Sequence, residues 1–260
     1  MRKATRPQRR IMIASVAAAG AALTLAVLLT NRGSDRRPTC KNTLIPAYLS
    51  PPQIVAAVRG SIRARVIVVN PHNGPGAEED ARYRDAVRAV QKAGARVLGY
   101  VPTNYGARPA ADVAADIDRY VKWYGVDGIF LDESSSDAAH LAYYREAARH
   151  SRGSGAPLVA VNPGVVPARA YFDLADIVVT FEGPYAKYAE ALGRMPDWVR
   201  EQPPRRTAHL VYGASREQAL DAVRQADGAG YLYVTSGSPP DPWSALPSYL
   251  ADEERELEAC

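Results

Sequence analysis

Eight short apolar runs alternate along this sequence with segments of helix length, and this alternation limits the folds that the chain can adopt. The runs are rich in β-branched residues and about five to seven residues long, which is typical of strands buried on both faces. They span residues 44–49, 65–70, 96–101, 127–133, 157–162, 176–182, 207–212 and 231–235. Buried strands joined by helices form parallel sheets.

The segments between these runs have helical periodicity. From Val113 to Tyr124, apolar residues recur at the spacing that lines one face of a helix. Ser215 and Gln218 have the form of a capping box, and Gly94 is placed to end a helix over residues 83–90. The connection between the fifth and sixth runs is the shortest and leaves room only for a short helix near residues 168–172.

Eight strands that alternate with helices predict an α/β protein with a closed (β/α)8 barrel of the TIM type. An open, doubly wound sheet is the alternative. Such a sheet usually carries a glycine-rich nucleotide loop after an early strand, and the sequence contains neither G-x-G-x-x-G nor G-x-x-x-x-G-K-[ST]. In a barrel, functional groups lie at the carboxyl ends of the strands. Those positions are therefore the place to look for a site.

Carboxyl groups follow two of the predicted strands. Asp132 and Glu133 come directly after the apolar residues 129–131, and Glu182 follows residues 177–181. Adjacent carboxylates at the end of a buried strand repel each other and lose hydration, which perturbs pKa values as acid/base sites require. A structural alternative is that they cap the next helix or pair with arginine. Because the fourth and sixth strands are second neighbours, their inward residues share a common space.

Two carboxyl groups across a barrel mouth are the minimum equipment for glycoside hydrolysis. Adjacent residues on a regular strand point to opposite faces, so Asp132 and Glu133 enter the mouth together only if the strand ends or bulges between them. We expect carboxyl oxygens of Glu182 and one of these residues within about 10 Å of each other. The other strand ends supply aromatic and hydrogen-bonding side chains suited to a sugar, which are Tyr48, Asn70, Tyr100, Asn162 and Tyr212.

The remaining reactive residues give weaker signals. His72 lies in the Pro/Gly-rich loop 71–76 after the second strand and is a candidate to line the site. The four histidines lack metal-binding spacing, and no G-x-S-x-G elbow or internal cysteine supports a nucleophilic hydrolase. Three acids alone do not require a metal ion. The sequence therefore predicts neither a metal site nor a cofactor.

The first 37 residues differ from the rest of the chain. Basic residues precede an uncharged apolar run over residues 11–29, which predicts a cleaved signal peptide or an uncleaved transmembrane anchor, with the anchor slightly favoured. Either one exports residues 38–260, the predicted barrel domain, to the cell surface or the medium. Residues 1–37 carry a net charge of +7 and the whole chain +4, so the barrel domain carries −3. The basic isoelectric point thus gives no support for nucleic-acid binding.

The sequence has two cysteines, Cys40 and Cys260, which bracket the predicted domain. An even pair in an oxidising compartment predicts a disulfide. Two unpaired thiols near the chain ends are the alternative.

Six stretches together resemble the spherulin-4 family. They are residues 45–48, 69–76, 98–105, 125–133, 161–164 and 176–182, in order along the chain. The resemblance implies a (β/α)8 fold and an endo-acting hydrolase of α-linked galactosamine or N-acetylgalactosamine polymers. It carries catalytic candidacy to Asp132, Glu133 and Glu182, and its third stretch adds Tyr105 to the predicted substrate-binding residues. A non-catalytic polysaccharide-binding or cell-envelope protein on the same barrel is the alternative.

Overall fold

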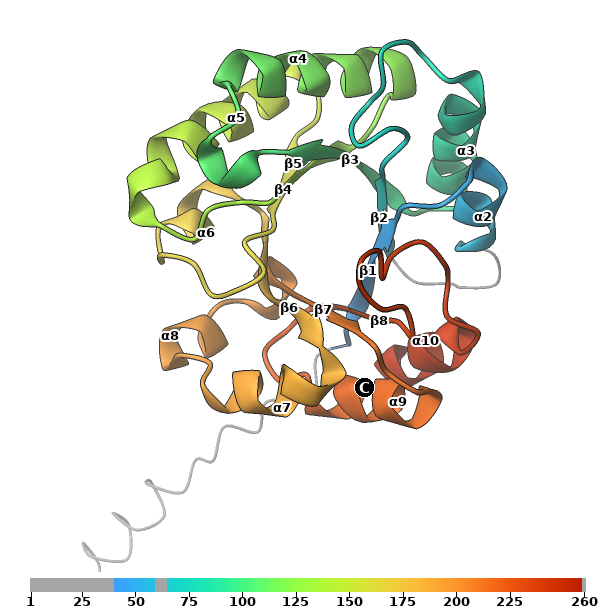
Figure 1. Ribbon diagram of the computed structural model, residues 1–260, viewed down its shortest axis with the longest axis vertical. Coiled ribbons are helices and arrows are strands. Elements are labelled where there is room, and N and C mark those ends of the chain that lie inside the picture. Colours follow the sequence, from blue (N-terminus) through green and yellow to red (C-terminus); the bar gives the residue numbers. More distant parts are fainter. Residues whose placement is uncertain (1–39, 59–64, 259–260) are drawn as a thin grey trace, which may run out of the picture. The chain divides into compact units, whose positions relative to one another are not determined.

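The computed structural model describes residues 40–58 and 65–258, which form a closed barrel of parallel strands with helices outside it (Figure 1). The strands follow one another around the barrel in chain order, and β1 pairs with β8 to close it. They are β1 Asn42–Ala47, β2 Arg65–Val69, β3 Arg96–Pro102, β4 Gly128–Asp132, β5 Leu158–Val161, β6 Ile177–Pro184, β7 Thr207–Tyr212 and β8 Tyr231–Val234. The predicted (β/α)8 barrel is confirmed, and the open sheet is wrong.

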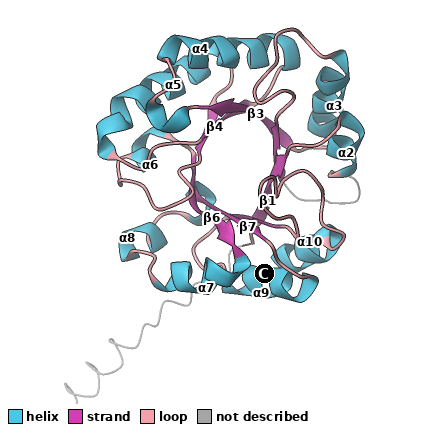
Figure 2. Ribbon diagram, in the orientation of Figure 1, coloured by secondary structure: helices cyan, strands magenta, loops and turns pink. Residues whose placement is uncertain are grey.

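The helices form the outer ring of the barrel (Figure 2). They are α2 Pro51–Ala56, α3 Ala81–Lys92, α4 Ala110–Arg119, α5 Leu141–Ser154, α6 Tyr171–Leu174, α7 Tyr185–Gly193, α8 Asp197–Arg200, α9 Arg216–Gln225 and α10 Leu250–Glu258, with the short turns η1 Asn104–Gly106, η2 Tyr120–Tyr124, η3 Ala138–His140 and η4 Pro204–Arg206. The predicted capping box is present, since Gln218 N donates to the Ser215 hydroxyl and Ser215 N donates to the Gln218 side chain. The short helix expected near residues 168–172 is α6.

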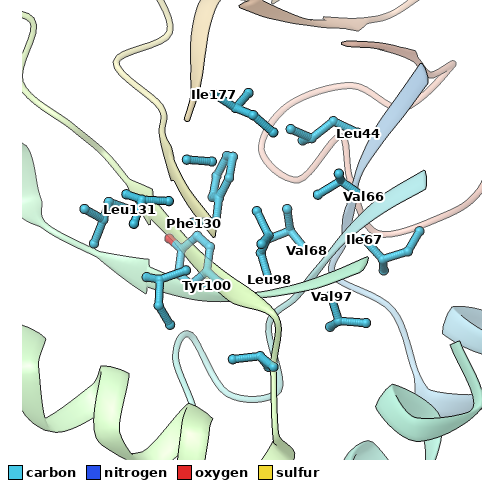
Figure 3. Close-up of a cluster of buried hydrophobic side chains, with 14 of the residues drawn as sticks. Leu44, Val66, Ile67, Val68, Val97, Leu98, Tyr100, Phe130, Leu131 and Ile177 are labelled. Atoms are coloured by element: carbon cyan, nitrogen blue, oxygen red, sulfur yellow. The ribbon is translucent and has the colours of Figure 1, made fainter. Parts of the chain in front are cut away.

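The barrel interior is filled by side chains, which form the floor of the mouth. Phe130 on β4 pairs with Tyr100 on β3 and with Ala160 on β5, and paired residues of parallel neighbours point to the same face. Figure 3 shows Phe130 and Tyr100 among the buried apolar side chains. Asp132 lies two residues beyond Phe130 and so faces the same side. The mouth therefore stands on a packed core that excludes water from below.

Two sequence predictions fall outside the described residues. The apolar run 11–29 precedes the described part of the chain, and Cys260 follows it. The targeting segment and the Cys40–Cys260 disulfide therefore stay predictions. Within residues 40–58 and 65–258, no helix combines the length and the apolar character needed to cross a bilayer.

Candidate active site

The end of β4 separates the two adjacent acids. Asp132 is the last residue of the strand, and its carboxylate accepts a hydrogen bond inside the mouth from the side chain of Asn162, at 2.7 Å. Glu133 has left the strand with a φ of 48°, in the left-handed region, and its side chain is exposed. The strand thus ends between Asp132 and Glu133, which is one of the two possibilities, an end or a bulge, given by the sequence analysis. Asp132 is the one that enters the mouth.

Hydrogen bonds from the end of β3 hold this unusual bend. The Thr103 hydroxyl lies 2.8 Å from the carbonyl oxygens of both Asp132 and Glu133. The backbone N–H of Tyr105, itself at a φ of 54°, donates to the Glu133 carbonyl at 2.6 Å. Backbone conformations of this kind persist only where the surroundings fix them, and they concentrate at functional sites. The bend fixes the direction in which Asp132 points.

A β-bulge in β6 directs Glu182 into the mouth. The register between β6 and β7 slips between Val179 and Phe181, so Thr180 is an extra residue. Because side chains alternate along a strand, one extra residue reverses the face of every later residue. Phe181 consequently packs outward against Tyr188 of α7, with ring centroids 5.0 Å apart. Glu182, the next residue, points inward and accepts from Asn162.

Asn162, directly after β5, joins the two carboxyl groups. Its amide nitrogen donates to Asp132 Oδ1 at 2.7 Å and to Glu182 Oε2 at 2.5 Å. Because one nitrogen contacts both oxygens, they are at most about 5.2 Å apart, which confirms the predicted proximity. The amide oxygen of Asn162 accepts from Gly164 N at 3.0 Å. Both amide protons are therefore used to position the carboxyl groups, whereas the sequence had assigned Asn162 to the sugar.

Burial and mutual repulsion keep a proton on the pair. Burial, followed by the charge of Glu182, raises the pKa of Asp132 to about 7, against hydrogen bonds from Asn162 and Tyr100. Burial also raises the pKa of Glu182, opposed by hydrogen bonds from Asn162 and Trp243. Near neutral pH the pair holds one proton, so one carboxyl can act as an acid while the other is ionised.

Aromatic side chains surround the pair. The rings of Tyr48, just after β1, and Tyr100 meet edge to face with centroids 5.3 Å apart. Burial raises the pKa of both hydroxyls, so they stay protonated and can donate hydrogen bonds. Trp243, in the loop after β8, contacts Tyr212 with centroids 6.2 Å apart, and its indole donates to Glu182. Flat aromatic faces beside carboxyl groups suit the apolar faces of a sugar ring.

Other residues predicted for the site have local contacts. Asn70 accepts from Gly74 N at 2.9 Å and so shapes the loop after β2. His72 in that loop is exposed, and its ring lies against Tyr83 with centroids 6.4 Å apart. Tyr105 is 61% exposed on the rim of the mouth. In the described part of the chain, no three His, Cys, Asp or Glu side chains are grouped to hold a metal ion.

Removing the bridging amide should change the pH profile of activity. Because hydrogen bonds from Asn162 lower the pKa of both carboxyl groups, Asn162→Ala should move the alkaline limb of kcat to higher pH. It should also lower kcat about 10- to 100-fold, because the carboxyl groups lose their fixed positions. Initial rates across pH test this, with Asn70→Ala as the matched amide deletion in the same mouth. An unmoved alkaline limb in Asn162→Ala would contradict the bridging role.

The carboxyl group of Asp132 should lower the free energy of unfolding at high pH. It keeps a proton in the folded state up to about pH 7, whereas in the unfolded chain it loses the proton near pH 3.8. The unfolding free energy therefore falls as pH rises between these values. Asp132→Asn should not show this fall, because its amide does not titrate. We expect the variant to melt at a higher temperature than the native protein at pH 8. The difference should be about 2–4 °C for each kcal/mol of unfolding free energy that the native protein loses, and it should be small at pH 4. Asp85→Asn, on the exposed face of α3, controls for removal of one carboxyl group. A melting difference that does not depend on pH would refute the explanation.

Solved structures share this barrel. Sph3 of Aspergillus clavatus, in complex with GalNAc, is 25% identical with a TM-score of 0.76, over 85% of this chain and 99% of that one. A GH113 β-1,4-mannanase matches over 85% of this chain and 99% of its own, at 8% identity and a TM-score of 0.54. A family GH18 chitinase from the fern Peteris ryukyuensis matches over 84% and 100%, at 10% identity and a TM-score of 0.54. The last two show the fold alone.

Sequence comparison covers nearly the whole described barrel. The model of spherulation-specific family 4 matches residues 43–255. Spherulin-4 of Physarum polycephalum is 30% identical over 234 residues, which are 83% of this chain and 70% of the relative. The matched region contains all eight strands except Asn42, the first residue of β1, and both members of the carboxyl pair. The chain therefore belongs to spherulation-specific family 4.

Proposed function

We propose that this chain is a glycoside hydrolase in which Asp132 and Glu182 carry out the acid and nucleophile chemistry. The observation that carries the proposal is the amide nitrogen of Asn162, which binds both carboxyl groups and holds their oxygens at most about 5.2 Å apart. Because the pKa of Asp132 is raised to about 7, its carboxyl group can hold the single proton that such a pair needs. Barrels named as mannanase and chitinase share the fold.

The spacing favours retention of anomeric configuration. Retaining glycosidases hold their carboxyl groups about 5–5.5 Å apart, whereas inverting enzymes leave about 6.5–9.5 Å for a water molecule. One carboxyl group protonates the glycosidic oxygen while the other attacks the anomeric carbon and forms a covalent glycosyl-enzyme. Water then attacks that carbon, and the first carboxylate takes the proton of the water. Azide rescue of Asp132→Ala and Glu182→Ala assigns the roles through the configuration of the glycosyl azide. Azide that replaces the missing nucleophile gives an inverted product, whereas azide that attacks the glycosyl-enzyme of the acid/base variant gives a retained one.

The proposed substrate is an α-linked polymer of galactosamine or N-acetylgalactosamine, cut within the chain. The Sph3 structure, which contains GalNAc, supports this sugar. A surface groove of about 380 Å³ extends from Gly164 and Glu182 past Val165 to Arg194, and it gives a polymer room to continue beyond the carboxyl pair. The net charge of −3 on residues 38–260 favours a polymer with free amino groups.

The proposed location is outside the cytoplasm, either anchored or released. This rests on the basic residues that precede the apolar run 11–29. Cys40 and Cys260 would then form their disulfide in an oxidising compartment. Intact-protein mass before and after reduction tests the pairing, because a disulfide adds two hydrogens on reduction.

The decisive test of function is reducing-end release by the purified full chain from galactosamine, N-acetylgalactosamine and galactose polymers. Activity on a galactosamine-type polymer, absent in Glu182→Gln and retained in Glu146→Gln on the exposed face of α5, is the expected result. A protein that binds these polymers without releasing reducing ends would instead be the non-catalytic polysaccharide-binding protein. Equal activity in Glu182→Gln and the native chain would refute the site.

A further inference from the structure

A second cavity opens at the opposite, N-terminal mouth of the barrel. Its volume is about 280 Å³, and three arginines line it, which are Arg96, Arg205 and Arg206. Arg96 begins β3, and the other two directly precede β7. Tyr231, which also lines the cavity, begins β8. Because the strands are parallel, these residues and the carboxyl pair lie at opposite ends of the barrel.

The charge in this cavity is unbalanced. Its one acidic residue, Asp176, is already occupied by Arg152 at 3.0 Å and by the backbone N–H of Val159 at 2.9 Å. Among residues 40–58 and 65–258, no carboxylate forms an ion pair with any of the three arginines that line the cavity. Three positive charges thus face one neutralised acid, although residues 38–260 carry a net charge of −3. Such a cavity attracts an anion.

Some hydrogen-bond donors in this cavity have partners and others do not. Arg206 Nη2 donates to the carbonyl oxygens of Phe172 and Ala175, while its Nε is buried without a partner among the described residues. Arg96 Nη2 donates to the Tyr231 hydroxyl at 3.2 Å, which leaves the hydroxyl proton available. An unsatisfied buried donor destabilises the fold unless a ligand or water meets it. Guanidinium groups form paired hydrogen bonds with phosphate oxygens, and phosphate therefore fits this cavity.

The chain reaches the barrel at this same mouth. β1 begins at Asn42, and the N-terminal ends of all eight strands lie together. The predicted membrane-inserting run ends at Leu29, so a linker of about 12 residues, with a reach of about 40 Å, joins it to β1. A contact between the barrel and the membrane would set the direction in which the mouth with the carboxyl pair faces. A membrane surface supplies phosphate groups within its reach.

We propose that the cavity lined by Arg96, Arg205 and Arg206 binds the phosphate of anionic lipid headgroups. The contact would seat the N-terminal mouth on the membrane and turn the carboxyl pair toward the polysaccharide outside. The inference rests on the proposed anchoring of the chain and does not depend on its hydrolase activity. Two basic side chains that contribute no described ion pair, Arg96 and Arg205, are the ones to change, because Arg206 also supports the backbone after α6.

Hydrogen–deuterium exchange of the full chain reconstituted in vesicles tests the contact. In vesicles of phosphatidylcholine and phosphatidylglycerol in equal parts, peptides around Arg96, Arg205 and Tyr231 should exchange several-fold more slowly than in phosphatidylcholine alone. Arg96→Gln/Arg205→Gln should abolish the difference, and high salt should weaken it. The matched control is Arg88→Gln/Arg145→Gln, which removes two exposed charges from α3 and α5 and should keep the difference.

Two results would overturn the proposal. One is equal exchange in the two kinds of vesicle, or a difference that survives Arg96→Gln/Arg205→Gln. The other is equal slowing by inorganic phosphate added to phosphatidylcholine vesicles, which would make the cavity a site for free phosphate. Reducing-end release from soluble polymer should be unchanged in the double variant. Failure of lipid binding is therefore distinguishable from failure of the hydrolase proposal.

Discussion

Glu182→Gln and Asp132→Asn are each expected to lower kcat at least about 1,000-fold while leaving polymer binding within a few-fold of the native value. Each substitution keeps the size of the side chain and removes one carboxyl group of the pair, so the pair can no longer supply both a proton and a charge. Initial rates of reducing-end release and equilibrium binding of the polymer measure the two quantities separately.

The losses of kcat caused by the two substitutions should not be additive. Because the carboxyl groups act on the same bond, the double variant Asp132→Asn/Glu182→Gln should be about as slow as the slower single variant. Glu133→Gln should lower kcat less than either, since the Glu133 side chain is exposed on the rim. Additive losses in the double variant, or a larger effect at Glu133 than at Asp132, would contradict the assignment of the pair.

Exchange of Phe181 and Glu182 should be as damaging as loss of the carboxyl group itself. The bulge at Thr180 turns residue 181 outward and residue 182 inward, so Phe181→Glu/Glu182→Phe keeps both types of side chain and moves the carboxyl group out of the mouth. We expect a loss of kcat of at least about 1,000-fold in a variant whose circular dichroism matches that of the native chain.

Thr180→Val is the control for this exchange. It leaves Phe181 and Glu182 in place and removes a hydroxyl that is buried without a partner among the described residues. Its activity should stay within a few-fold of native, and its melting temperature should be equal or higher. A folded exchange variant that keeps native activity would show that residue 181 faces the mouth and that the bulge does not direct Glu182.

The fold was predictable because its signals are local. Each strand is an apolar run such as residues 129–131, and each helix between them carries its own periodicity or cap. The carboxyl ends of the strands follow from chain order once the sheet is parallel. The sequence alone therefore places Asp132, Glu182, Tyr48 and Tyr100 at one mouth.

The finer geometry of the site was not predictable because it depends on contacts between distant residues. Val179, Thr180 and Phe181 carry no sequence mark of a bulge, and regular alternation through them would have turned Glu182 away from Asp132. Asn162 would follow β5 whether it bound the sugar or joined the carboxyl groups. Only its distances to the oxygens of Asp132 and Glu182, on two other strands, show that it joins them.

Trp243 was missed for a related reason. It lies in the long Pro-rich loop between β8 and α10, far beyond the end of its strand. Chain order places at the mouth only the residues that directly follow strands, and it does not place a side chain that returns to the mouth from a loop. Its contact with Glu182 comes from the folding of that loop over the barrel. A tryptophan within a Pro-rich loop after a barrel strand was the available signal.

Trapping of the glycosyl-enzyme tests the central claim most directly. An activated 5-fluoro-galactosaminide slows the second step, and intact mass with peptide mapping then locates the sugar on the protein. We predict one sugar per chain, attached to Asp132 or to Glu182, and none on the variant that lacks that carboxyl group. A sugar attached to any other residue, or a product of inverted configuration with no attached sugar, would contradict double displacement by this pair.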